Sequence, residues 1–466
     1  MTRALSLCWT FLTRERSLRR GGAPAPAAPP AQRKRRKQRG VAIITVLIAL
    51  SLTLILTTQF GTATNIDLIA AANYRDQMRA HFLSRSALNF TEFVVRLQQI
   101  LDKPAVQQQI GPVQVTEFAN QLMLAFCGTS QEVRAAVGDA ATLSKGLGAD
   151  IGTCGVVGAI TTDDDKINMN CANEPTIAAV TESELKGLMF FNAYDPVFEE
   201  ADAENWRRDR ELQASALLDY VDRDASRGVA NTKSAGTTED YGYESLKDHY
   251  KQKNTYLDTV GELKLARGVD DRFWTLFGSA FTVYGGCKIN LSAVTNVQLI
   301  AAVLFLTAKN QSDPVLLNPQ KLFMLAGLVA KAKQFGMQFT KADEFVDFVK
   351  DPGAKIGALA GQTSMAGSAA AAAMGASIPG LTGSDKVSLE LDSTRVGQIA
   401  KFGARRTYRV QAWGEIERGS TSFPPIRSTI TGVWDTGAPT LQNVRKSATT
   451  PPTYNPKGTW VFLRED

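Results

Sequence analysis

A long uninterrupted apolar segment is the clearest feature of the hydrophobic and polar pattern. Between residues 41 and 66 no side chain carries a charge, and the next charged residue is Asp67. About 20 apolar or small residues, rising roughly 1.5 Å each in a helix, span the roughly 30 Å hydrocarbon core of a bilayer. The segment therefore predicts a membrane-spanning helix, and we expect it to be the only membrane span.

The helical pattern continues beyond the apolar segment. Residues 72–88 contain neither proline nor glycine. Apolar residues then recur at alternating spacings of four and three, as in a helix that packs on one face. This stripe consists of Leu83, Ala87, Phe90, Val94, Leu97 and Leu101. We expect one continuous rod over residues 41–102, and a membrane-proximal coiled coil is an alternative that the pattern leaves open.

The last third of the chain alternates in the manner of strands. Segments 387–391 and 408–412 alternate apolar and polar residues, and segments 428–434 and 459–463 are further strand candidates. We expect a C-terminal antiparallel sheet packed on the long helix. Residues 351–384 are rich in Ala, Gly and Ser, which is typical of a flexible insertion or surface loop.

Two further patterns fall in the middle of the chain. Residues 257–277 predict two short helices around Gly268. The motif Ile-Asn-Met-Asn at residues 167–170 recurs as Ile-Asn-Leu-Ser at residues 289–292, each time ahead of an apolar stretch. Asn side chains bond to nearby backbone in turns and helix caps, so we expect both motifs to lead into helices. The repeat suggests two related subdomains.

The basic charge of the chain is concentrated in its first 40 residues. The 466 residues, 44% of them hydrophobic, include 52 Lys and Arg and 46 Asp and Glu. The first 40 hold 11 basic residues and one acidic residue, which leaves 41 basic and 45 acidic residues for the rest. The rest is slightly acidic, so charge gives no support for a nucleic-acid partner. With only His81 and His249, a histidine-rich metal site is excluded.

The basic residues directly precede the apolar segment. Residues 33–39 hold six Lys and Arg and are followed by Gly40. Such a cluster favours retention on the cytoplasmic side, which places the bulk of the chain across the membrane. An ordinary signal peptide cleaved after Ala63 and an uncleaved anchor are two interpretations. The third explains more of the residues: the segment resembles a prepilin signal, cut by prepilin peptidase after Gly40 to leave Val41 as the new, methylated N-terminus.

Several motifs follow this N-terminus in a characteristic order. They lie at residues 159–170, 217–224, 236–243, 257–263 and 265–269. In this order the chain resembles the minor pseudopilin family known as type II secretion system protein K, over roughly residues 35–300. The resemblance implies an α+β fold, in which a long N-terminal helix accompanies a pseudopilin-like antiparallel sheet and an inserted, mainly helical (SAM-like) domain.

The resemblance also implies a division of the chain. Residues 1–40 would be a basic prepilin-type leader, and residues 41–102 a transmembrane helix that continues into the periplasm. Residues 103–165 would begin the periplasmic head, residues 166–295 would form a mainly helical domain with an acidic loop, and residues 296–466 would form the C-terminal part with the Ala/Gly-rich insertion. The implied role is at the tip of the pseudopilus, where the chain starts its assembly for protein export across the outer membrane.

The resemblance further implies an inner-membrane location and specific partners, namely other minor pseudopilins, the type II secretion apparatus and prepilin peptidase. A second observation concerns Thr45, the fifth residue after the proposed cut. Most related subunits have Glu there, which neutralises the N-terminal amine of a neighbour inside the apolar helix bundle, where an unpaired charge is costly. A subunit with no acid at this position fits a place with no subunit ahead of it.

The acidic residues of the middle third are the best candidate for a chemical site. Asp219, Asp222 and Asp224 fall within six residues, and Glu239 and Asp240 follow a glycine-containing loop. Hard oxygen ligands from two short segments suit Ca²⁺, which takes six to eight oxygens, and the resemblance also implies calcium here. We predict Asp222, Asp224, Glu239 and Asp240 as ligands; a merely solvated acidic loop is the alternative.

Cleavage after Gly40 would remove Cys8 and leave Cys127, Cys154, Cys171 and Cys287. An even number in a compartment that permits disulfides predicts two bridges, with three pairings open, or four buried thiols.

Two other classes of function compete with assembly. The sequence has no phosphate loop, no GxGxxG after a strand, no HExxH and no GxSxG, so we expect no enzyme. A membrane-anchored periplasmic hydrolase with paired carboxylates needs no such motif and predicts activity on a substrate. A membrane-tethered DNA-binding protein predicts salt-sensitive DNA affinity, whereas an assembly role predicts co-purification with other pseudopilins.

Overall fold

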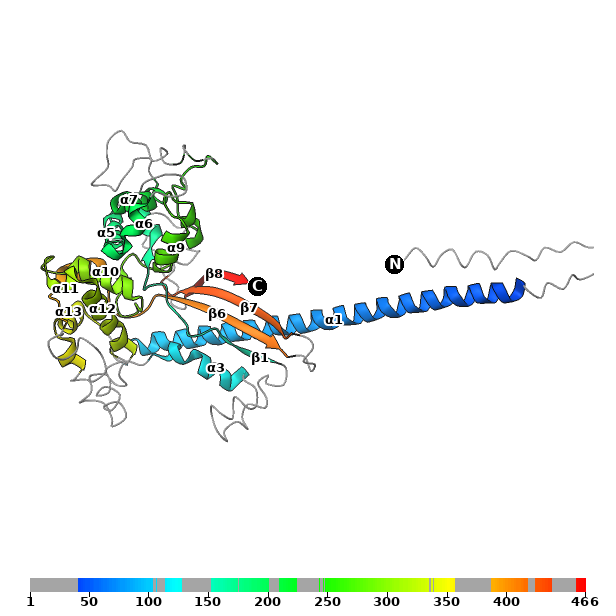
Figure 1. Cartoon of the computed structure of the whole chain (residues 1–466). Coiled ribbons are helices and arrows are strands. Elements are labelled where there is room, and N and C mark those ends of the chain that lie inside the picture. The colour runs from blue at the N-terminus through cyan, green and yellow to red at the C-terminus, as the bar shows by residue number, and fades with distance from the viewer. Residues whose placement is uncertain are drawn as a thin grey trace, which may run out of the picture. The chain divides into compact units, whose positions relative to one another are not determined.

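The computed structural model describes most of the chain after residue 40. The described residues are 41–103, 106, 114–127, 152–174, 176–200, 209–223, 243, 246, 248–334, 337, 339–356, 387–417, 424–437 and 458–466, excepting the side chains of 124–126. They fall into two compact units, Met1–Ala71 and Ala72–Asp466. A long helix, an antiparallel sheet and a set of shorter helices make up the fold, so the predicted α+β class is confirmed (Figure 1).

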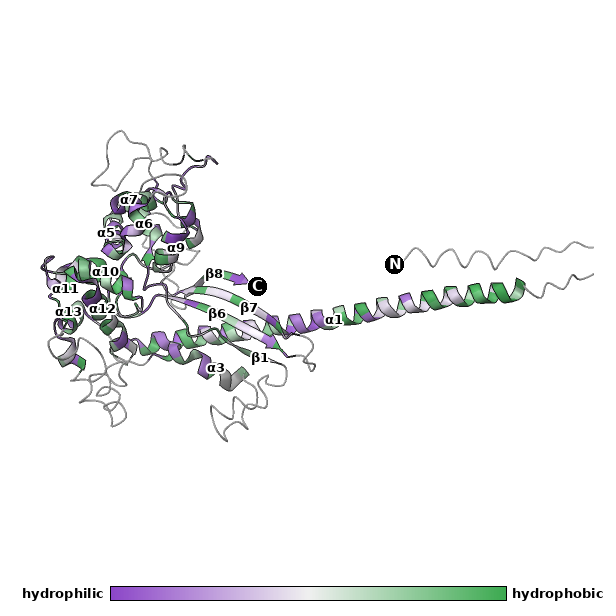
Figure 2. Ribbon diagram, viewed as in Figure 1, coloured by the Kyte–Doolittle hydropathy of each residue, from purple (hydrophilic) through white to green (hydrophobic). Residues whose placement is uncertain are grey.

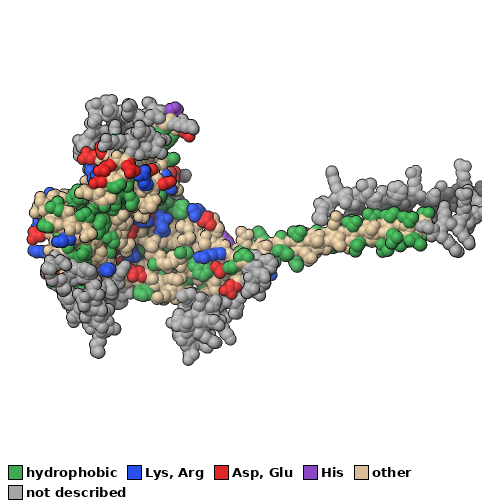
Figure 3. Space-filling view, in the orientation of Figure 1, with side chains coloured by type: hydrophobic (Ala, Val, Ile, Leu, Met, Phe, Trp, Pro, Cys, Tyr) green, Lys and Arg blue, Asp and Glu red, His purple; other side chains and the backbone are tan. Residues whose placement is uncertain are grey.

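The described part of the first unit is the beginning of helix α1 (Val41–Leu101), which is continuous as predicted. Every residue from 41 to 71 is exposed, and the hydropathy colouring of Figure 2 shows this part of the helix as mainly apolar. Figure 3 shows hydrophobic side chains along this part of the helix, interspersed with backbone and other uncharged side chains. Among the described residues, this helix alone is long and apolar enough to cross a membrane. It fits a single-pass anchor for a soluble domain.

Hydroxyl groups in this segment are satisfied within the helix. The side chains of Thr45, Thr53 and Thr57 donate to carbonyl oxygens one turn back, at distances of 2.9, 3.0 and 2.9 Å respectively. Threonine therefore costs little in an apolar helix, because no hydroxyl is left without a partner.

The second unit contains a four-stranded antiparallel sheet. Its strands are β1 (Thr153–Val156), β6 (Thr407–Ile416), β7 (Ile426–Asp435) and β8 (Thr459–Glu465), in the order β1-β6-β7-β8. Strands β6 and β7 form a long hairpin, from Thr407 opposite Asp435 to Ile416 opposite Ile426. The predicted strands at 408–412, 428–434 and 459–463 lie within β6, β7 and β8.

This sheet packs on the C-terminal half of α1, as predicted. Ala87, Val94 and Val95 of α1 are fully or almost fully buried against Tyr408 of β6 and Ile430 of β7. Helix α3 (Ala119–Cys127), which follows a short 3₁₀ helix η1 (Val115–Phe118), completes this core with Ala119 and Met123. Figure 1 shows α3 beside β1 and α1. We call α1, η1, α3 and the sheet the body.

A mainly helical region, which we call the helical lobe, is inserted between β1 and β6. Its longer helices are α5 (Ala178–Leu188), α7 (Arg210–Asp219), α9 (Asp271–Phe277), α10 (Val297–Thr307), α12 (Pro319–Gln334), α13 (Ala342–Lys350) and α16 (Ser393–Ile399). Its shorter helices are η3 (Met169–Asn173), η4 (Asn192–Tyr194), α6 (Asp195–Glu199), η5 (Val260–Leu265), η6 (Gly278–Ala280) and α11 (Pro314–Leu317). The predicted helix pair around Gly268 is η5 and α9.

The helical lobe has its own hydrophobic core. Helix α10 lies at its centre, with Leu299 to Leu304 all at most 1% exposed. This core extends from Ile167 to Ala400 and shares no buried residue with the core of the body. The two cores are therefore separate clusters, although the lobe and the sheet also touch outside them: the rings of Tyr284 and Phe462 of β8 lie 6.2 Å apart.

The repeated Ile-Asn motifs occupy equivalent structural positions. β2 (Ile167–Asn168) pairs in parallel with β3 (Phe281–Thr282), and β4 (Ile289–Asn290) pairs in parallel with β5 (Ala400–Lys401). The side chain of Asn168 accepts the backbone N–H of Asn170 at 3.1 Å, and that of Asn290 accepts the N–H of Ser292 at 3.1 Å. Asn168 caps η3, as the sequence predicts for a helix entry.

The strand predicted at residues 387–391 is wrong. Val387, Leu389 and Leu391 are buried, as the alternation predicts. The backbone, however, bonds to the ends of helices instead of a neighbouring strand: Leu389 N–H donates to Val349 O at the end of α13, and Glu390 O accepts the N–H of Lys309, just after α10. Only a single bridge forms, from Leu391 to Ala308.

Two disulfides decide among the three pairings. Cys127 of α3 is bonded to Cys154 of β1, within the body. Cys171 of η3 is bonded to Cys287, within the helical lobe. Each bridge thus secures one of the two cores.

Candidate functional site

The residues predicted to govern processing and filament packing lie at the start of α1. Gly40 is outside the described residues, whereas Val41 is the first residue of the helix. Thr45 is exposed, one turn further on, and its hydroxyl also lies 3.2 Å from Val41 O. Thr45 thus places a short neutral side chain at the position where an acid inside a packed apolar helix bundle would need a charged partner.

The predicted calcium ligands fall largely outside the described residues. Asp224, Glu239 and Asp240 lie there, and Asp222 is described just after the end of α7. Within the described ranges, no group of three or more His, Cys, Asp or Glu side chains is arranged to hold a metal ion. The calcium site therefore stays a prediction.

A buried polar site lies where the body and the helical lobe meet. The chain enters the lobe through residues 161–166 and leaves it through residues 402–407, which we call the connecting segments. Three consecutive acids in the first segment are buried: Asp163, Asp164 and Asp165 are 0%, 2% and 9% exposed. Burial of three adjacent carboxylates is costly unless partners compensate them.

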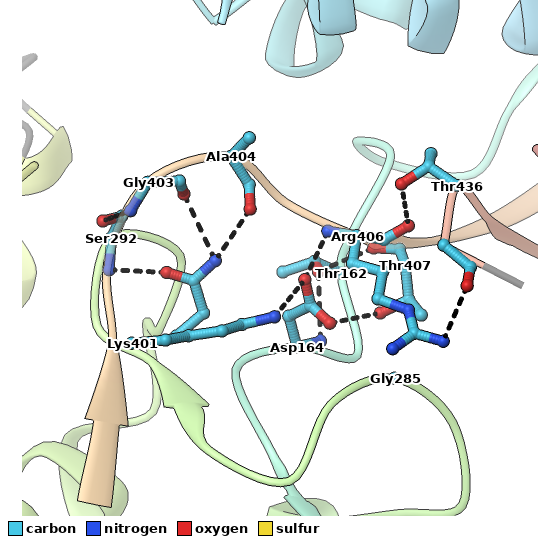
Figure 4. Close-up of polar contacts among 12 residues, drawn as sticks. Thr162, Asp164, Gly285, Ser292, Lys401, Gly403, Ala404, Arg406, Thr407 and Thr436 are labelled. Atoms are coloured by element: carbon cyan, nitrogen blue, oxygen red, sulfur yellow. Dashed lines mark hydrogen bonds and ion pairs between the residues drawn. The ribbon is translucent and has the colours of Figure 1, made fainter. Parts of the chain in front are cut away.

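Asp164 ties the two connecting segments together (Figure 4). Its carboxylate accepts the backbone N–H of Arg406 and, at 3.1 Å, the hydroxyl of Thr407. The Nζ of Lys401 lies 3.2 Å from the same carboxylate. The backbone oxygen of Asp164 accepts the N–H of Asn290 in β4 at 2.8 Å. The hydroxyl of Thr162 also joins the two segments, because it donates to Thr407 O at 2.7 Å.

A glycine accommodates this carboxylate. Gly285 has a φ of +90°, and a Cβ added there would lie 2.8 Å from Oδ1 of Asp164. The left-handed backbone and the close approach both require glycine at this position.

Asp163 forms the strongest ion pair of the site. Its two oxygens accept Nε and Nη2 of Arg409 at 3.1 and 2.6 Å, and Lys166 Nζ donates to it at 2.9 Å. Burial by itself raises the pKa of Asp163, but Arg409 and Lys166 outweigh burial and hold this pKa below its usual 3.8. Because Arg409 belongs to β6, the pair fastens the first connecting segment to the sheet.

Asp165 is less well compensated. Its Oδ1 is buried and has no hydrogen-bond partner among the described residues. Burial raises the pKa of Asp165 from 3.8 to about 6, against the attraction of Lys166 and Arg405. On the side of the lobe, burial lowers the pKa of Lys333 in α12 from 10.5 to about 7, although the charge of Asp165 opposes this shift.

Arg405 connects this corner to the body. Its Nη1 donates to Thr116 Oγ1 at 3.4 Å, and its Nη2 lies 3.9 Å from Glu117 Oε1. Its charge also acts on Asp102 at the end of α1, whose pKa is nevertheless raised because burial dominates. The site therefore joins α1, η1, α12 and both connecting segments.

The sequence alone did not identify this site. Residues 163–165 lie in one of the motifs on which the family resemblance rests, and nothing in their local sequence points to a particular chemistry. Their partners lie far away in sequence, such as Arg409, which is 246 residues from Asp163. A run of three acids flanked by apolar segments was the only local signal.

Comparison with known proteins gives a similarity among solved structures. No protein-family model matches the chain, and comparison with curated proteins finds no relative. Among solved structures, it is similar to a chain of the GspK-GspI-GspJ complex from the Type 2 Secretion System of enterotoxigenic Escherichia coli. The two chains share 12% sequence identity with a TM-score of 0.37, covering 68% of this chain and 80% of that chain.

Proposed function

We propose that this chain is a minor pseudopilin, anchored by a single pass in the inner membrane, that caps the periplasmic pseudopilus of a type II secretion system and helps start its assembly. The observation that carries the proposal is the continuity of α1. One helix contains the apolar span directly after a basic leader and then becomes the packed support of an antiparallel sheet. The leader would be removed after Gly40 by prepilin peptidase.

The proposed mechanism is assembly without catalysis. Apolar helices associate in a bilayer by close packing and shape, and residues 41–66 offer such a surface. The head would then dock on other minor pseudopilins in the periplasm. Thr45 supports the place at the tip, because a subunit without the acid cannot neutralise the amine of a subunit ahead of it.

N-terminal mass analysis of the mature protein tests the processing step. Protein recovered from cells that contain prepilin peptidase is expected to begin at N-methylated Val41. A chain that begins at Met1 would support an uncleaved anchor, and one that begins after Ala63 would support an ordinary signal peptide; either result contradicts the proposal. A Gly40→Val variant, which adds a branched side chain beside the proposed cut, is the matched control and is expected to keep the leader.

Substitution of Thr45 tests the tip position. Thr45→Glu introduces an acid that would have no amine to neutralise, and an unpaired charge in the membrane is costly. We expect this variant to recover several-fold less of the other minor pseudopilins on co-purification, whereas Thr45→Val, of nearly equal shape, is expected to match the parent chain. If Thr45→Glu instead increases recovery, a subunit lies ahead of this one and the tip position is wrong. Hydrolysis of a substrate, or salt-sensitive DNA binding, would favour the competing functions.

A further inference from the structure

The two connecting segments are the only covalent routes between the body and the helical lobe along the chain, and they lie side by side. Thr161 and Arg409 pair as an antiparallel bridge, and Asp164 joins Arg406 and Thr407 across the pair. We call this pair of connecting segments the stalk of the lobe. Any movement of the lobe against the sheet must disturb the polar groups beside the stalk.

Charged groups from several elements surround this stalk. Asp165 faces Asp163 and Lys166 from its own turn, and Arg405 from the second connecting segment. Lys333 of α12 faces Asp165 and Arg405, and its Nζ donates to Val294 O at 2.8 Å with the Phe339 ring centroid 6.0 Å away. Other charged or titratable neighbours are Lys401 beside Asp164, Arg409 beside Asp163, and Arg406 with its partner Asp435. Asp102, Glu117 and Tyr408 lie around Arg405.

Two of these groups are incompletely compensated, unlike Asp163 and Asp164. Oδ1 of Asp165 has no hydrogen-bond partner among the residues that the structure describes, and Lys333 has a carbonyl and an aromatic ring beside its ammonium. A buried carboxylate and a partly buried ammonium that lack a direct ion pair destabilise the closed arrangement whenever both are charged.

We propose that this site is a proton-sensitive lock on the helical lobe, in which the Asp165 carboxyl and the Lys333 amine change their proton occupancy when the lobe opens away from the sheet. Opening would return both groups to water, where each has its ordinary proton affinity. The lock goes beyond the assembly role and does not depend on it.

The direction of the effect follows from the two pKa values. The closed state holds a proton on Asp165 up to about pH 6, whereas solvated Asp165 loses it near 3.8, so opening becomes easier as pH rises from 3.8 to 6. The closed state releases the Lys333 proton above about pH 7, whereas solvated Lys333 keeps it to 10.5, so opening becomes harder as pH rises from 7 to 10.5. The lock is therefore weakest between about pH 6 and 7.

The other neighbours do not reverse this direction. The pKa of Asp102 is also raised by burial, so Asp102 adds to the easier opening that Asp165 causes as pH rises from 3.8 to 6. The pKa of Asp163 is lowered, so its contribution changes only below 3.8. Burial raises the pKa of Tyr408, so it stays neutral over the range considered.

Native-state hydrogen exchange on the full chain in detergent tests the lock. The backbone N–H groups of Arg406 and Asn290 both donate to Asp164, so their protection reports opening of the stalk. Protection factors, corrected for the intrinsic exchange rate at each pH, are compared with those of Ala412 and Ile430, which face each other in the β6–β7 ladder. We expect the stalk amides to show a minimum of protection between pH 6 and 7 that the ladder amides lack.

Two variants assign the limbs of this profile. The pKa of Asp165 is raised by about two units, which corresponds to a change of up to roughly 100-fold in the opening equilibrium between pH 4 and 6. Asp165→Asn is expected to abolish this change. Lys333→Met is expected to abolish the recovery above pH 7, and Asp258→Asn, whose side chain is 89% exposed, is the control that keeps the parent profile. The proposal is overturned if stalk and ladder amides exchange together at every pH, or if Asp165→Asn keeps the acid limb.

Discussion

Gly414 of β6 lies directly on the backbone of α1 at Ala80. A Cβ added to Gly414 would lie 2.3 Å from the carbonyl oxygen of Ala80 and 2.5 Å from the backbone nitrogen of Ser84. Ala80 and Ser84 are both 0% exposed, so the strand and the helix are in contact without intervening side chains. This contact sets how closely the sheet can approach the helix.

We therefore expect Gly414→Ala to destabilise the body. The added methyl group meets backbone atoms, which cannot move aside as the end of a flexible side chain can. Overpacking of this kind costs about 1–3 kcal/mol or more. Chemical denaturation of the full chain in detergent, followed by circular dichroism, measures the loss.

A second glycine provides the control for this substitution. Gly397 lies in α16, and a Cβ added there would meet open space. Gly397→Ala is expected to leave stability unchanged or raise it by up to about 1 kcal/mol, because alanine is the better helix former. If both variants lose stability equally, the close approach of β6 to α1 is not the cause.

Glu184 gives the helical lobe a pH dependence of its own. This α5 residue is 2% exposed, and its Oε1 has no hydrogen-bond partner among the described residues. Burial raises the pKa of Glu184 well above 4.5, against the backbone N–H of Ile289 and the charge of Lys288. The carboxyl is therefore kept neutral in the folded lobe at pH values at which it ionises in the unfolded chain.

Glu184→Gln is expected to leave stability near pH 4 unchanged and to raise it at pH 8. Below pH 4.5 Glu184 is protonated in both the folded and the unfolded chain, so it causes no loss of stability. Above pH 4.5 the unfolded chain ionises first, and the free energy of unfolding falls by at most about 1.4 kcal/mol per pH unit until the folded-state pKa is reached. Glutamine cannot ionise, so the Glu184→Gln variant does not suffer this pH-dependent fall in the free energy of unfolding. Denaturation midpoints at several pH values measure the difference.

Glu182→Gln on the same helix is the matched control. Its carboxylate lies 3.1 Å from Lys186 Nζ near the surface, and such pairs are worth at most about 1 kcal/mol. The Glu182 variant is expected to follow the parent chain at every pH. A Glu184→Gln variant that did so too would show that the buried carboxyl does not govern the alkaline loss of stability.

The parts of the fold with a regular period could be predicted from the sequence. Helix α1 and strands β6, β7 and β8 have long repeats of apolar residues, and the structure places them as expected. The buried face of α1 was predicted incompletely, because Ser84, Thr91 and Gln98 are 0% exposed although they are polar. Ser84 and Thr91 bond to carbonyls within the helix, at 2.8 and 2.6 Å, so local periodicity could not reveal their burial.

The buried site could not be predicted for a different reason. Several of its contacts join residues more than 240 positions apart, such as Thr162 with Thr407. Adjacent acids in a short turn normally indicate a solvated loop, and only the folded neighbourhood supplies Arg409 and Lys401 as partners. Segment 387–391 shows the converse, because its alternation predicts burial correctly but not the backbone partner.

The two disulfides are expected to differ in their contribution to stability. Cys171 and Cys287 are 116 residues apart, whereas Cys127 and Cys154 are 27 apart. If a disulfide acts mainly by restricting the unfolded chain, the longer loop gives roughly 5 kcal/mol and the shorter one roughly 3.5 kcal/mol.

Replacing both members of each pair by alanine tests this difference. Loss of the Cys171–Cys287 bridge is expected to cost about 1 kcal/mol more than loss of the Cys127–Cys154 bridge. Denaturation of the full chain in detergent, with reduced parent protein as reference, measures both. An equal or reversed order would mean that packing around the cysteines, and not the length of the closed loop, decides their contribution.

The ion pair between Asp163 and Arg409 should be necessary for the attachment of the lobe. Arg409→Gln leaves a fully buried carboxylate with Lys166 as its remaining cation. Breaking a buried pair typically costs about 3–5 kcal/mol; the guanidinium side is about a third exposed (32%), so we expect roughly 2–4 kcal/mol.

Two further variants separate the pair from its surroundings. The double variant Asp163→Asn with Arg409→Gln removes both charges and is expected to recover part of the loss, since no carboxylate is left uncompensated. Arg464→Gln breaks an exposed pair with Asp466, in which the side chains are 64% and 48% exposed, and is expected to change stability by less than about 0.5 kcal/mol.

The pH dependence supplies an independent check on this pair. Because the pKa of Asp163 lies below 3.8 in the folded chain, its stabilising contribution is complete above pH 3.8 and is lost as pH falls through the lower, folded-state value. The stability difference between the parent chain and Asp163→Asn should therefore stay constant from pH 5 to 8 and shrink only in stronger acid. A difference that already shrank between pH 5 and 6 would show that the Asp163 carboxylate is not held by Arg409 and Lys166.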